Sequence, residues 1–152
     1  IGRSAIPANP VSHSLRVGDS VLAEKITLEL GETASAGDVI VFENSEKGSE
    51  KDVLCKRVIA CAGQTVDMKN GSVYIDGKKI TEDYAKGDSY PLYLGKGKHI
   101  SYPYEIPEGE IWVMGDNREN SADSRYFGPI SEDSVIGICV MRYLPWNRIG
   151  LL

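Results

Sequence analysis

A tight hairpin turn in the middle of the chain is the sequence feature that most restricts its fold. Asn70 and Gly71 are the residue pair preferred in two-residue type I′ turns, which join neighbouring antiparallel strands. Counting outward from this turn places Met68 opposite Val73, so that apolar side chains meet on one face of the hairpin. The segment 66–75 is therefore predicted to form an antiparallel β-hairpin.

Other apolar segments extend the β pattern on both sides of the hairpin. Runs rich in β-forming residues at 38–42, 111–114 and 135–141 predict further strands. Helical signals are sparse, because 26–30 is a short apolar stretch that ends at a glycine and 131–134 could cap only a single helical turn. These patterns predict a mostly β fold.

Length and charge limit the class of protein. The chain has 152 residues, which suits one domain, and its net charge of −5 argues against binding to nucleic acid. No apolar stretch approaches the ~20 residues of a membrane-spanning helix. The stretch 83–107, which carries glycines, prolines and tyrosines, is long for a connection without structure of its own. We expect a single domain over 1–152, with an inserted lobe at 83–107.

The cysteines and histidines give no sign of a metal or redox site. Cys55, Cys61 and Cys139 are odd in number and lack C-x-x-C spacing. They are interpreted as small apolar residues in strands. His13 and His99 are isolated from other candidate ligands. We therefore expect no metal and no cofactor.

The stretch 115–128 carries the strongest functional signal. It reads Gly-Asp-Asn-Arg-Glu-Asn-Ser-Ala-Asp-Ser-Arg-Tyr-Phe-Gly and directly follows an apolar strand. So many short polar side chains at a strand end indicate a buried hydrogen-bond network rather than a surface loop. On an extended chain Asp123 and Arg125 would share a face and could form an ion pair. The stretch resembles, nearly residue for residue, the last signature box of type I signal peptidases.

Three further segments resemble the other boxes of that family in the same order, at 15–19, 37–42 and 55–59. The resemblance implies a signal-peptidase-like complex β fold of coiled antiparallel sheets. It also implies a serine endopeptidase with a Ser–Lys dyad, whose partners are signal peptides or extended preprotein segments. The family is anchored in the cytoplasmic membrane and acts on its extracytoplasmic face, and we expect such an anchor ahead of residue 1.

The same resemblance assigns roles to five residues. Lys56 aligns with the general base, a role that requires a neutral lysine, and burial favours that form. From the residues alone, the simpler interpretation is that Lys56 extends from its strand to solvent. Ser121 aligns with the serine that orients the lysine. Asp123 and Arg125 align with an ion pair near the site, and Arg57 is expected to be structural.

Two segments align with the strands that hold the substrate in this family by main-chain pairing, which is a form of β-augmentation. Pockets in the family accept small residues, typically alanine, before the cleaved bond. The aligned positions are Ile6 and Pro7 in the first segment and Asp52, Val53 and Leu54 in the second.

The serine box departs from the family pattern. The family reads roughly Ile-Pro-Ser-Gly-Ser-Met-x-Pro-Thr-Leu, whereas residues 6–15 here read Ile-Pro-Ala-Asn-Pro-Val-Ser-His-Ser-Leu. Pro10 therefore stands at the nucleophile position, and Ala8 stands at the position of an oxyanion-hole serine. Proline has neither a hydroxyl group nor a backbone N–H, and the family uses that N–H in its oxyanion hole. We expect the chain to be inactive or severely impaired as a peptidase.

The sequence leaves two functional hypotheses open. In the first, the chain is a signal peptidase in fold and pathway, and the retained Lys56 and Ser121 favour this. Ser12 could approach Lys56 as a substitute nucleophile only if the strand register slipped. In the second, the chain is a non-catalytic homologue that binds extended peptides as a chaperone or assembly factor, and Pro10 and Ala8 favour this.

Overall fold

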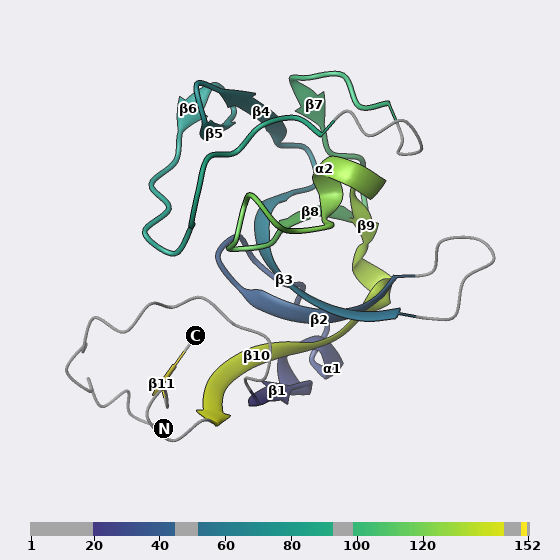
Figure 1. Cartoon of the computed structure of the whole chain (residues 1–152). Helices are drawn as coiled ribbons and strands as arrows, with labels where there is room; N and C mark the ends of the chain where they lie inside the picture. The colour runs from purple at the N-terminus through teal and green to yellow at the C-terminus, as the bar shows by residue number, and fades with distance from the viewer. Residues whose placement is uncertain (1–19, 45–51, 93–98, 145–149, 152) are drawn as a thin grey trace.

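The protein is built from two antiparallel sheets (Figure 1). The structure is a computed structural model that describes residues 20–44, 52–92, 99–144 and 150–151. The strands of the larger sheet are β1 (Ser20–Glu24), β2 (Val39–Asn44), β3 (Asp52–Cys61), β8 (Glu110–Met114), β9 (Ile130–Ser131), β10 (Val135–Leu144) and β11 (Gly150–Leu151). Their order is β1-β10-β2-β3-β8-β9, and β11 pairs with β10. The mostly β fold with antiparallel sheets is confirmed.

The smaller sheet contains the predicted hairpin. Its strands are β4 (Thr65–Lys69), β5 (Ser72–Ile75), β6 (Lys78–Lys79) and β7 (Tyr104–Glu105), in the order β6-β5-β4-β7. Met68 lies opposite Val73, which confirms the predicted register. Asn70 has a φ of 51° and Gly71 a φ of 75°, and positive φ at both positions is what a type I′ turn requires.

Helix is confined to single turns in the described residues. The three are α1 (Ile26–Glu29), α2 (Ser124–Phe127) and the 3-10 turn η1 (Glu132–Ser134). The last of these has the predicted cap, because Ser131 Oγ accepts a hydrogen bond from the Asp133 N–H at 3.3 Å. None of the helices in the described part of the chain has the length and apolar character of a membrane-spanning segment.

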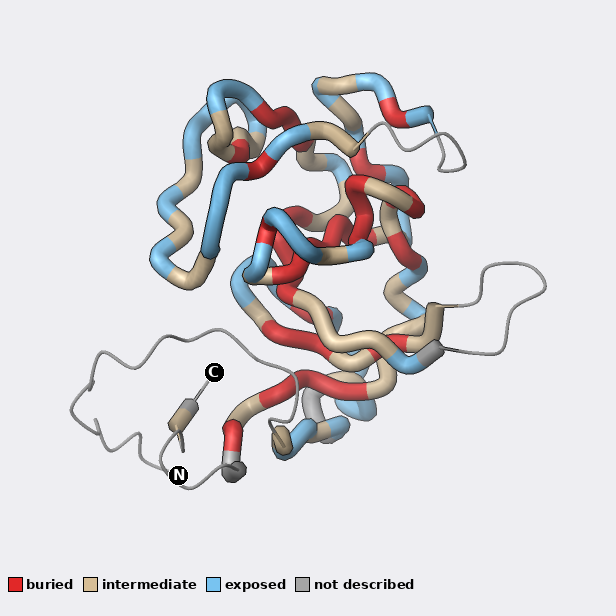
Figure 2. The backbone as a smooth tube through the Cα atoms, viewed as in Figure 1, coloured by how far each residue is buried: buried red, intermediate tan, exposed pale blue. Residues whose placement is uncertain are grey.

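Strand β8 separates two apolar cores. Successive side chains of a strand point to opposite faces of a sheet, so Ile111 and Val113 enter one core while Trp112 and Met114 enter the other. All four are fully buried, and Figure 2 shows β8 among the buried segments at the centre of the molecule. Because both faces of β8 are packed, the chain that leaves its end starts from a fixed position.

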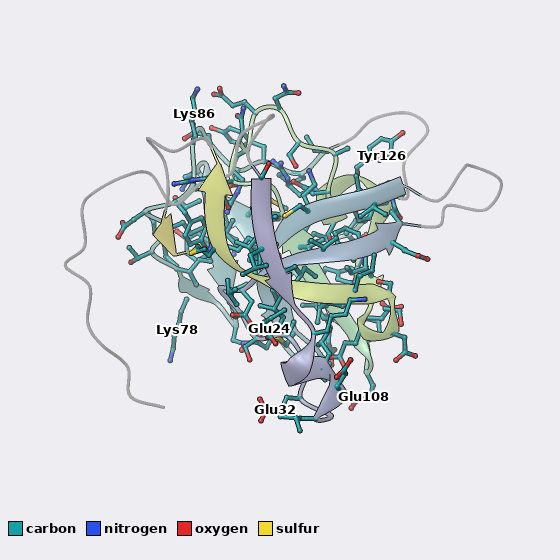
Figure 3. All side chains as sticks on the ribbon, turned by 90° about the horizontal axis from the view of Figure 1, so that it is seen from below. Glu24, Glu32, Lys78, Lys86, Glu108 and Tyr126 are labelled. Atoms are coloured by element: carbon teal, nitrogen blue, oxygen red, sulfur yellow. The ribbon has the colours of Figure 1, made fainter. Side chains whose placement is uncertain are left out.

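The stretch 83–107 contains β7 and also returns to the end of β8. Lys86 forms an isolated parallel bridge with Asn117. Its backbone N–H donates to the carbonyl oxygen of Asp116 at 2.7 Å, and the Arg118 N–H donates to the carbonyl oxygen of Lys86 at 2.9 Å. The Lys86 side chain points outward (Figure 3), so this contact is made by the main chain. The boundary of an inserted lobe stays a prediction.

Candidate active site

Lys56 and Ser121 are in hydrogen-bonding contact although 65 positions separate them in the sequence. Lys56 belongs to β3 and Ser121 to the loop that follows β8, and Lys56 Nζ donates to Ser121 Oγ at 3.1 Å. Strands β3 and β8 are paired, with Arg57 opposite Met114. This pairing places the lysine beside the start of the loop. The structure thus brings together the residues expected to be the base and its orienting partner.

Gly115 allows Ser121 to approach the end of β8. A Cβ atom at position 115 would overlap Ser121 Oγ, and it would lie 2.6 Å from Ser121 Cβ and 3.6 Å from Lys56 Nζ. The backbone of Gly115 is not in the left-handed region. The glycine is therefore required by the close approach of Ser121 and not by the conformation of the chain.

Gly115→Ala is expected to displace Ser121 and to break its hydrogen bond with Lys56. The added methyl group has no room, and overpacking of this kind lowers the free energy of unfolding by about 1–3 kcal/mol. Gly150→Ala is the matched control, because a Cβ atom there would meet nothing within 4 Å. Urea unfolding of both variants measures the difference, and equal midpoints would contradict the close approach described for Gly115.

Buried side chains form hydrogen bonds with both the backbone N–H and the carbonyl oxygen of Gly115. Its N–H donates to Asp123 Oδ2 at 3.0 Å, and its carbonyl oxygen accepts from Arg118 Nε at 2.9 Å. Asp123 is 0% exposed and Arg118 is 2% exposed. These bonds confirm the predicted hydrogen-bond network in the stretch 115–128, and they fix the surface against which Ser121 packs.

Asp123 and Arg125 form the predicted ion pair, but the expected reason was wrong. Two Arg125 nitrogens, Nε and Nη2, donate to the two Asp123 carboxylate oxygens at 2.9 Å each. Asp123 has an extended backbone, but it is the N-cap of α2 and Arg125 lies inside that helical turn, so the two residues do not share a face of an extended chain. The cap bond runs from the Arg125 N–H to Asp123 Oδ1 at 3.1 Å. One carboxylate therefore pairs with the guanidinium, caps α2 and binds the Gly115 N–H.

Arg57 ties the strand that carries Lys56 to its surroundings. Its guanidinium donates to the two carboxylate oxygens of Asp116 at 3.0 and 2.9 Å, and to the carbonyl oxygen of Gly37 at 2.8 Å. It also lies 4.2 Å from the centre of the Tyr84 ring. The side chain is 5% exposed. These contacts link β3 to the loop after β8, as a structural role for Arg57 would require.

No pattern in the sequence indicated the partners of Arg118. Its guanidinium donates to Glu82 Oε1 at 2.6 Å, to Glu82 Oε2 at 3.1 Å and to Ser89 Oγ at 2.7 Å. These partners lie 36 and 29 positions earlier in the chain, so no local pattern connects them with the signature stretch. Burial, with a smaller contribution from the Glu82 charge, raises the pKa of the neighbouring Tyr84 to about 12.

The first half of β3 has one open side in the described structure. Residues 52–56 pair with β2 on one side, whereas the pairing with β8 on the other side begins at Arg57. Unpaired main-chain groups at a strand edge can pair with a further strand. The expected substrate positions Asp52, Val53 and Leu54 all lie in this open part of β3, and Val53 is 60% exposed.

The serine-box residues lie outside the described residues. These are Ile6 and Pro7, expected to contact substrate, together with Ala8 and Pro10, at the oxyanion-hole and nucleophile positions. Their roles stay predictions that rest on the sequence.

Two of the three cysteines are in contact. Cys55 Sγ in β3 and Cys139 Sγ in β10 are 3.8 Å apart. With Cys55 as donor, this hydrogen bond lowers the pKa of the Cys139 thiol, and together with burial it raises the pKa of Cys55. Cys61 instead donates to the carbonyl oxygen of Ala34 at 3.8 Å. All three are free thiols, and the described residues hold no group of three or more side chains suited to a metal ion.

The known proteins that this chain is similar to are described as signal peptidases. The family described as "Signal peptidase, peptidase S26" matches residues 1–146. The chain is 34% identical over 152 residues to a probable signal peptidase I-1 from Synechocystis sp., covering 97% of this chain and 73% of that protein. It is 34% identical over 152 residues to signal peptidase I from Leptolyngbya laminosa, covering 97% of this chain and 70% of that protein.

The fold is similar to that of a solved structure as well. A crystal structure of a signal peptidase I from Enterococcus faecalis matches with a TM-score of 0.50 and 26% sequence identity. The match covers 70% of this chain and 97% of the other.

Proposed function

The chain belongs to the signal peptidase family, peptidase S26, and we propose that its Lys56–Ser121 site receives an extended preprotein segment in the manner of a signal peptidase. The segment pairs with the open side of β3 at 52–56, and residues 6–9, which align with the second substrate-holding segment of the family, also bind it. Its residues before the scissile bond are small, typically alanine. The protein acts at the extracytoplasmic face of the cytoplasmic membrane.

The contact between Lys56 and Ser121 is the observation that carries this proposal. The amine lies 3.1 Å from the serine hydroxyl, and Lys56 stands at the inner end of the open part of β3. A peptide added to a sheet lies about 4.8 Å from its neighbour. The main chain of a peptide paired with residues 52–55 therefore passes close to the Lys56 amine, where a general base for attack on a peptide bond is needed.

In this proposal Lys56 is the general base and Ser121 orients its amine, while Pro10 replaces the nucleophilic serine of the family. A serine hydroxyl attacks a carbonyl group only after a base removes its proton. Pro10 supplies no hydroxyl group, and it also lacks the N–H that serves the oxyanion hole of the family. Loss of one oxyanion donor alone costs ~10² to 10³ in rate. The chain with Pro10 therefore binds the segment and leaves the peptide bond intact.

A second candidate function follows from Pro10 and Ala8. A family member that retains the peptide edge and loses the nucleophile binds extended preprotein segments without cutting them, as a chaperone or assembly factor does. Both candidates require peptide binding along β3. They differ in whether proteolysis belongs to the biological role of the protein.

Binding and cleavage measured on the same peptide test the proposal. We expect the unaltered chain to bind a fluorescent signal peptide with an Ala-x-Ala sequence before the bond, observed by anisotropy, and to bind a Leu-x-Leu version at least ~10-fold more weakly, because the pockets accept small residues. We expect mass spectrometry to detect no cleavage. Equal binding of the two peptides, or none, would refute the proposed peptide site.

Two lysine variants test the expected lack of peptidase activity separately from peptide binding. Lys56→Met removes the amine at the site, and Lys78→Met removes an exposed amine of β6 in the other sheet (Figure 3). Cleavage by the unaltered chain that Lys56→Met abolishes and Lys78→Met preserves would show that the chain is an active peptidase despite Pro10. Such a result would also exclude the non-catalytic candidate.

A further inference from the structure

The segment 82–89 connects the smaller sheet with the loop that follows β8. The Ser89 N–H donates to the carbonyl oxygen of Gly71 at 2.9 Å, which ties the end of the segment to the turn of the hairpin. A Cβ atom at Gly87 would lie 2.6 Å from Glu119 Cγ, so the backbone of the segment is in close contact with the loop. The segment is therefore packed against both the hairpin and the stretch that carries the candidate site.

Glu82, at the start of this segment, is the carboxylate partner of a buried arginine. Its two carboxylate oxygens accept from Arg118 Nη2 at 2.6 Å and from Arg118 Nη1 at 3.1 Å. The Arg118 side chain is 0% exposed and that of Glu82 is 10% exposed. A buried guanidinium depends on its carboxylate partner, and a pair with two parallel bonds also fixes the plane of the guanidinium. Glu82 therefore determines where the Arg118 guanidinium lies.

We propose that Glu82 is a positioning residue for the contact between Lys56 and Ser121. It acts through Arg118, whose Nε donates to the carbonyl oxygen of Gly115 at 2.9 Å. Ser121 packs so closely against Gly115 that a Cβ atom there would overlap Ser121 Oγ. The same hydroxyl accepts from Lys56 Nζ at 3.1 Å. Each link in this series is a direct contact, and the inference rests on the proposed role of Lys56 as the general base.

A role limited to stability would have a different consequence from a positioning role. The Arg118 guanidinium binds Glu82 with both Nη atoms and Gly115 with Nε. Without the carboxylate, the buried cation turns toward other acceptors, and the bond from Nε to the Gly115 carbonyl oxygen is lost. The surface against which Ser121 packs then shifts while the rest of the fold remains. A purely structural Glu82 would lower the stability and leave the position of Ser121 unchanged.

The NMR signal of the Ser121 Cβ atom in protein with ¹³C-labelled serine tests the inference. Glu82→Gln removes the charge and keeps the size of the side chain, and Glu105→Gln is the control, because Glu105 is an exposed glutamate of β7. We expect Glu82→Gln to shift or split the Ser121 signal and to leave the signal of Ser131, the cap of η1, in place. Glu105→Gln should move neither signal. This readout requires no peptidase activity.

Kinetics in a chain that carries Pro10→Ser and Ala8→Ser provide the second readout. We expect Glu82→Gln to lower kcat by ~10-fold in that chain, because small displacements of catalytic groups slow the chemical step. KM should stay unchanged, because the peptide pairs with β3 and makes no contact with Glu82 in the proposal. No cleavage by the parent chain would count against the proposed alignment of the serine box, and the Ser121 signal would still decide the role of Glu82.

Three results would overturn the inference. The first is an unmoved Ser121 signal in Glu82→Gln, even if the urea midpoint falls, because Glu82 would then only stabilise the fold. The second is a shift of the Ser131 signal as large as that of Ser121, and the third is a raised KM with unchanged kcat. If Glu82→Gln does not fold, Ser89→Ala replaces it. That variant removes one hydrogen bond of Arg118, at 2.7 Å, and keeps its charge paired, so it should shift the Ser121 signal by a smaller amount.

Discussion

A Pro10→Ser variant that also carries Ala8→Ser is expected to cleave a signal peptide that the unaltered chain leaves intact. The first change restores both a hydroxyl nucleophile and a backbone N–H, and the second restores a side-chain donor for the oxyanion. Removal of the nucleophile of a serine protease costs about 10⁶ in kcat, and each oxyanion donor contributes ~10² to 10³. We expect the rate of cleavage after Ala-x-Ala, followed by mass spectrometry, to rise by ~10³ or more.

Single variants separate the contributions. Pro10→Ser alone should recover most of the activity, because nucleophile and backbone donor return together, whereas Ala8→Ser alone should recover none. Adding Lys56→Met to the double variant should abolish cleavage, while Lys78→Met should leave it unchanged. If the double variant binds the peptide and still does not cleave it, then Pro10 and Ala8 are not the residues that limit turnover. The serine box would then be misaligned with the family.

The hairpin at 66–75 was predictable because everything that determines it is local. Asn70 and Gly71 fix a turn with two positive φ angles, and that turn sets the pairing of every residue on either side. A shift by one residue would move the apolar side chains to the wrong face. Sequence reasoning succeeds for such an element because its register depends only on neighbours in the chain.

The contact between Lys56 and Ser121 was predictable only through the family pattern. The residues are 65 positions apart, and the distance between them depends on the pairing of β3 with β8, which no short sequence pattern specifies. From the residues alone, a lysine extending to solvent was the simpler interpretation. The requirement for glycine at 115 becomes visible only when Ser121 is seen against the end of β8.

Two other features depended on contacts that the sequence could not reveal. Arg118 is buried because Glu82 and Ser89 return from the smaller sheet to meet it, and this requires the path of the chain between the two sheets. The thiols of Cys55 and Cys139 meet across an intervening strand. The chain has three cysteines without C-x-x-C spacing, and this pattern predicted only small apolar residues in strands. Strand order, which is a global property, brings them into contact.

Asp123→Ala is expected to be the most destabilising single substitution near the site. It leaves the Arg125 guanidinium, which is 1% exposed, buried without its carboxylate partner, and breaking a buried pair from one side costs about 3–5 kcal/mol. The Gly115 N–H and the Arg125 N–H lose their acceptor as well. Folded domains are stable by only about 5–15 kcal/mol, so a large part of the stability should be lost. Urea unfolding followed by tryptophan fluorescence, to which buried Trp112 contributes, measures the change.

A second variant distinguishes the buried charge from the lost hydrogen bonds. Asp123→Ala combined with Arg125→Met removes both members of the ion pair, and the double variant should be more stable than Asp123→Ala alone, because no unpaired charge remains buried. It should not reach the stability of the unaltered chain, because a buried N–H without an acceptor costs about 1–3 kcal/mol. Lys69→Ala, which removes a pair whose lysine is 62% exposed, should leave the stability almost unchanged, because exposed ion pairs are screened by solvent and contribute little. If Asp123→Ala were as mild as Lys69→Ala, the carboxylate would not be the central acceptor of this site, and the close approach of Ser121 to Gly115 would have to depend on Arg118 instead.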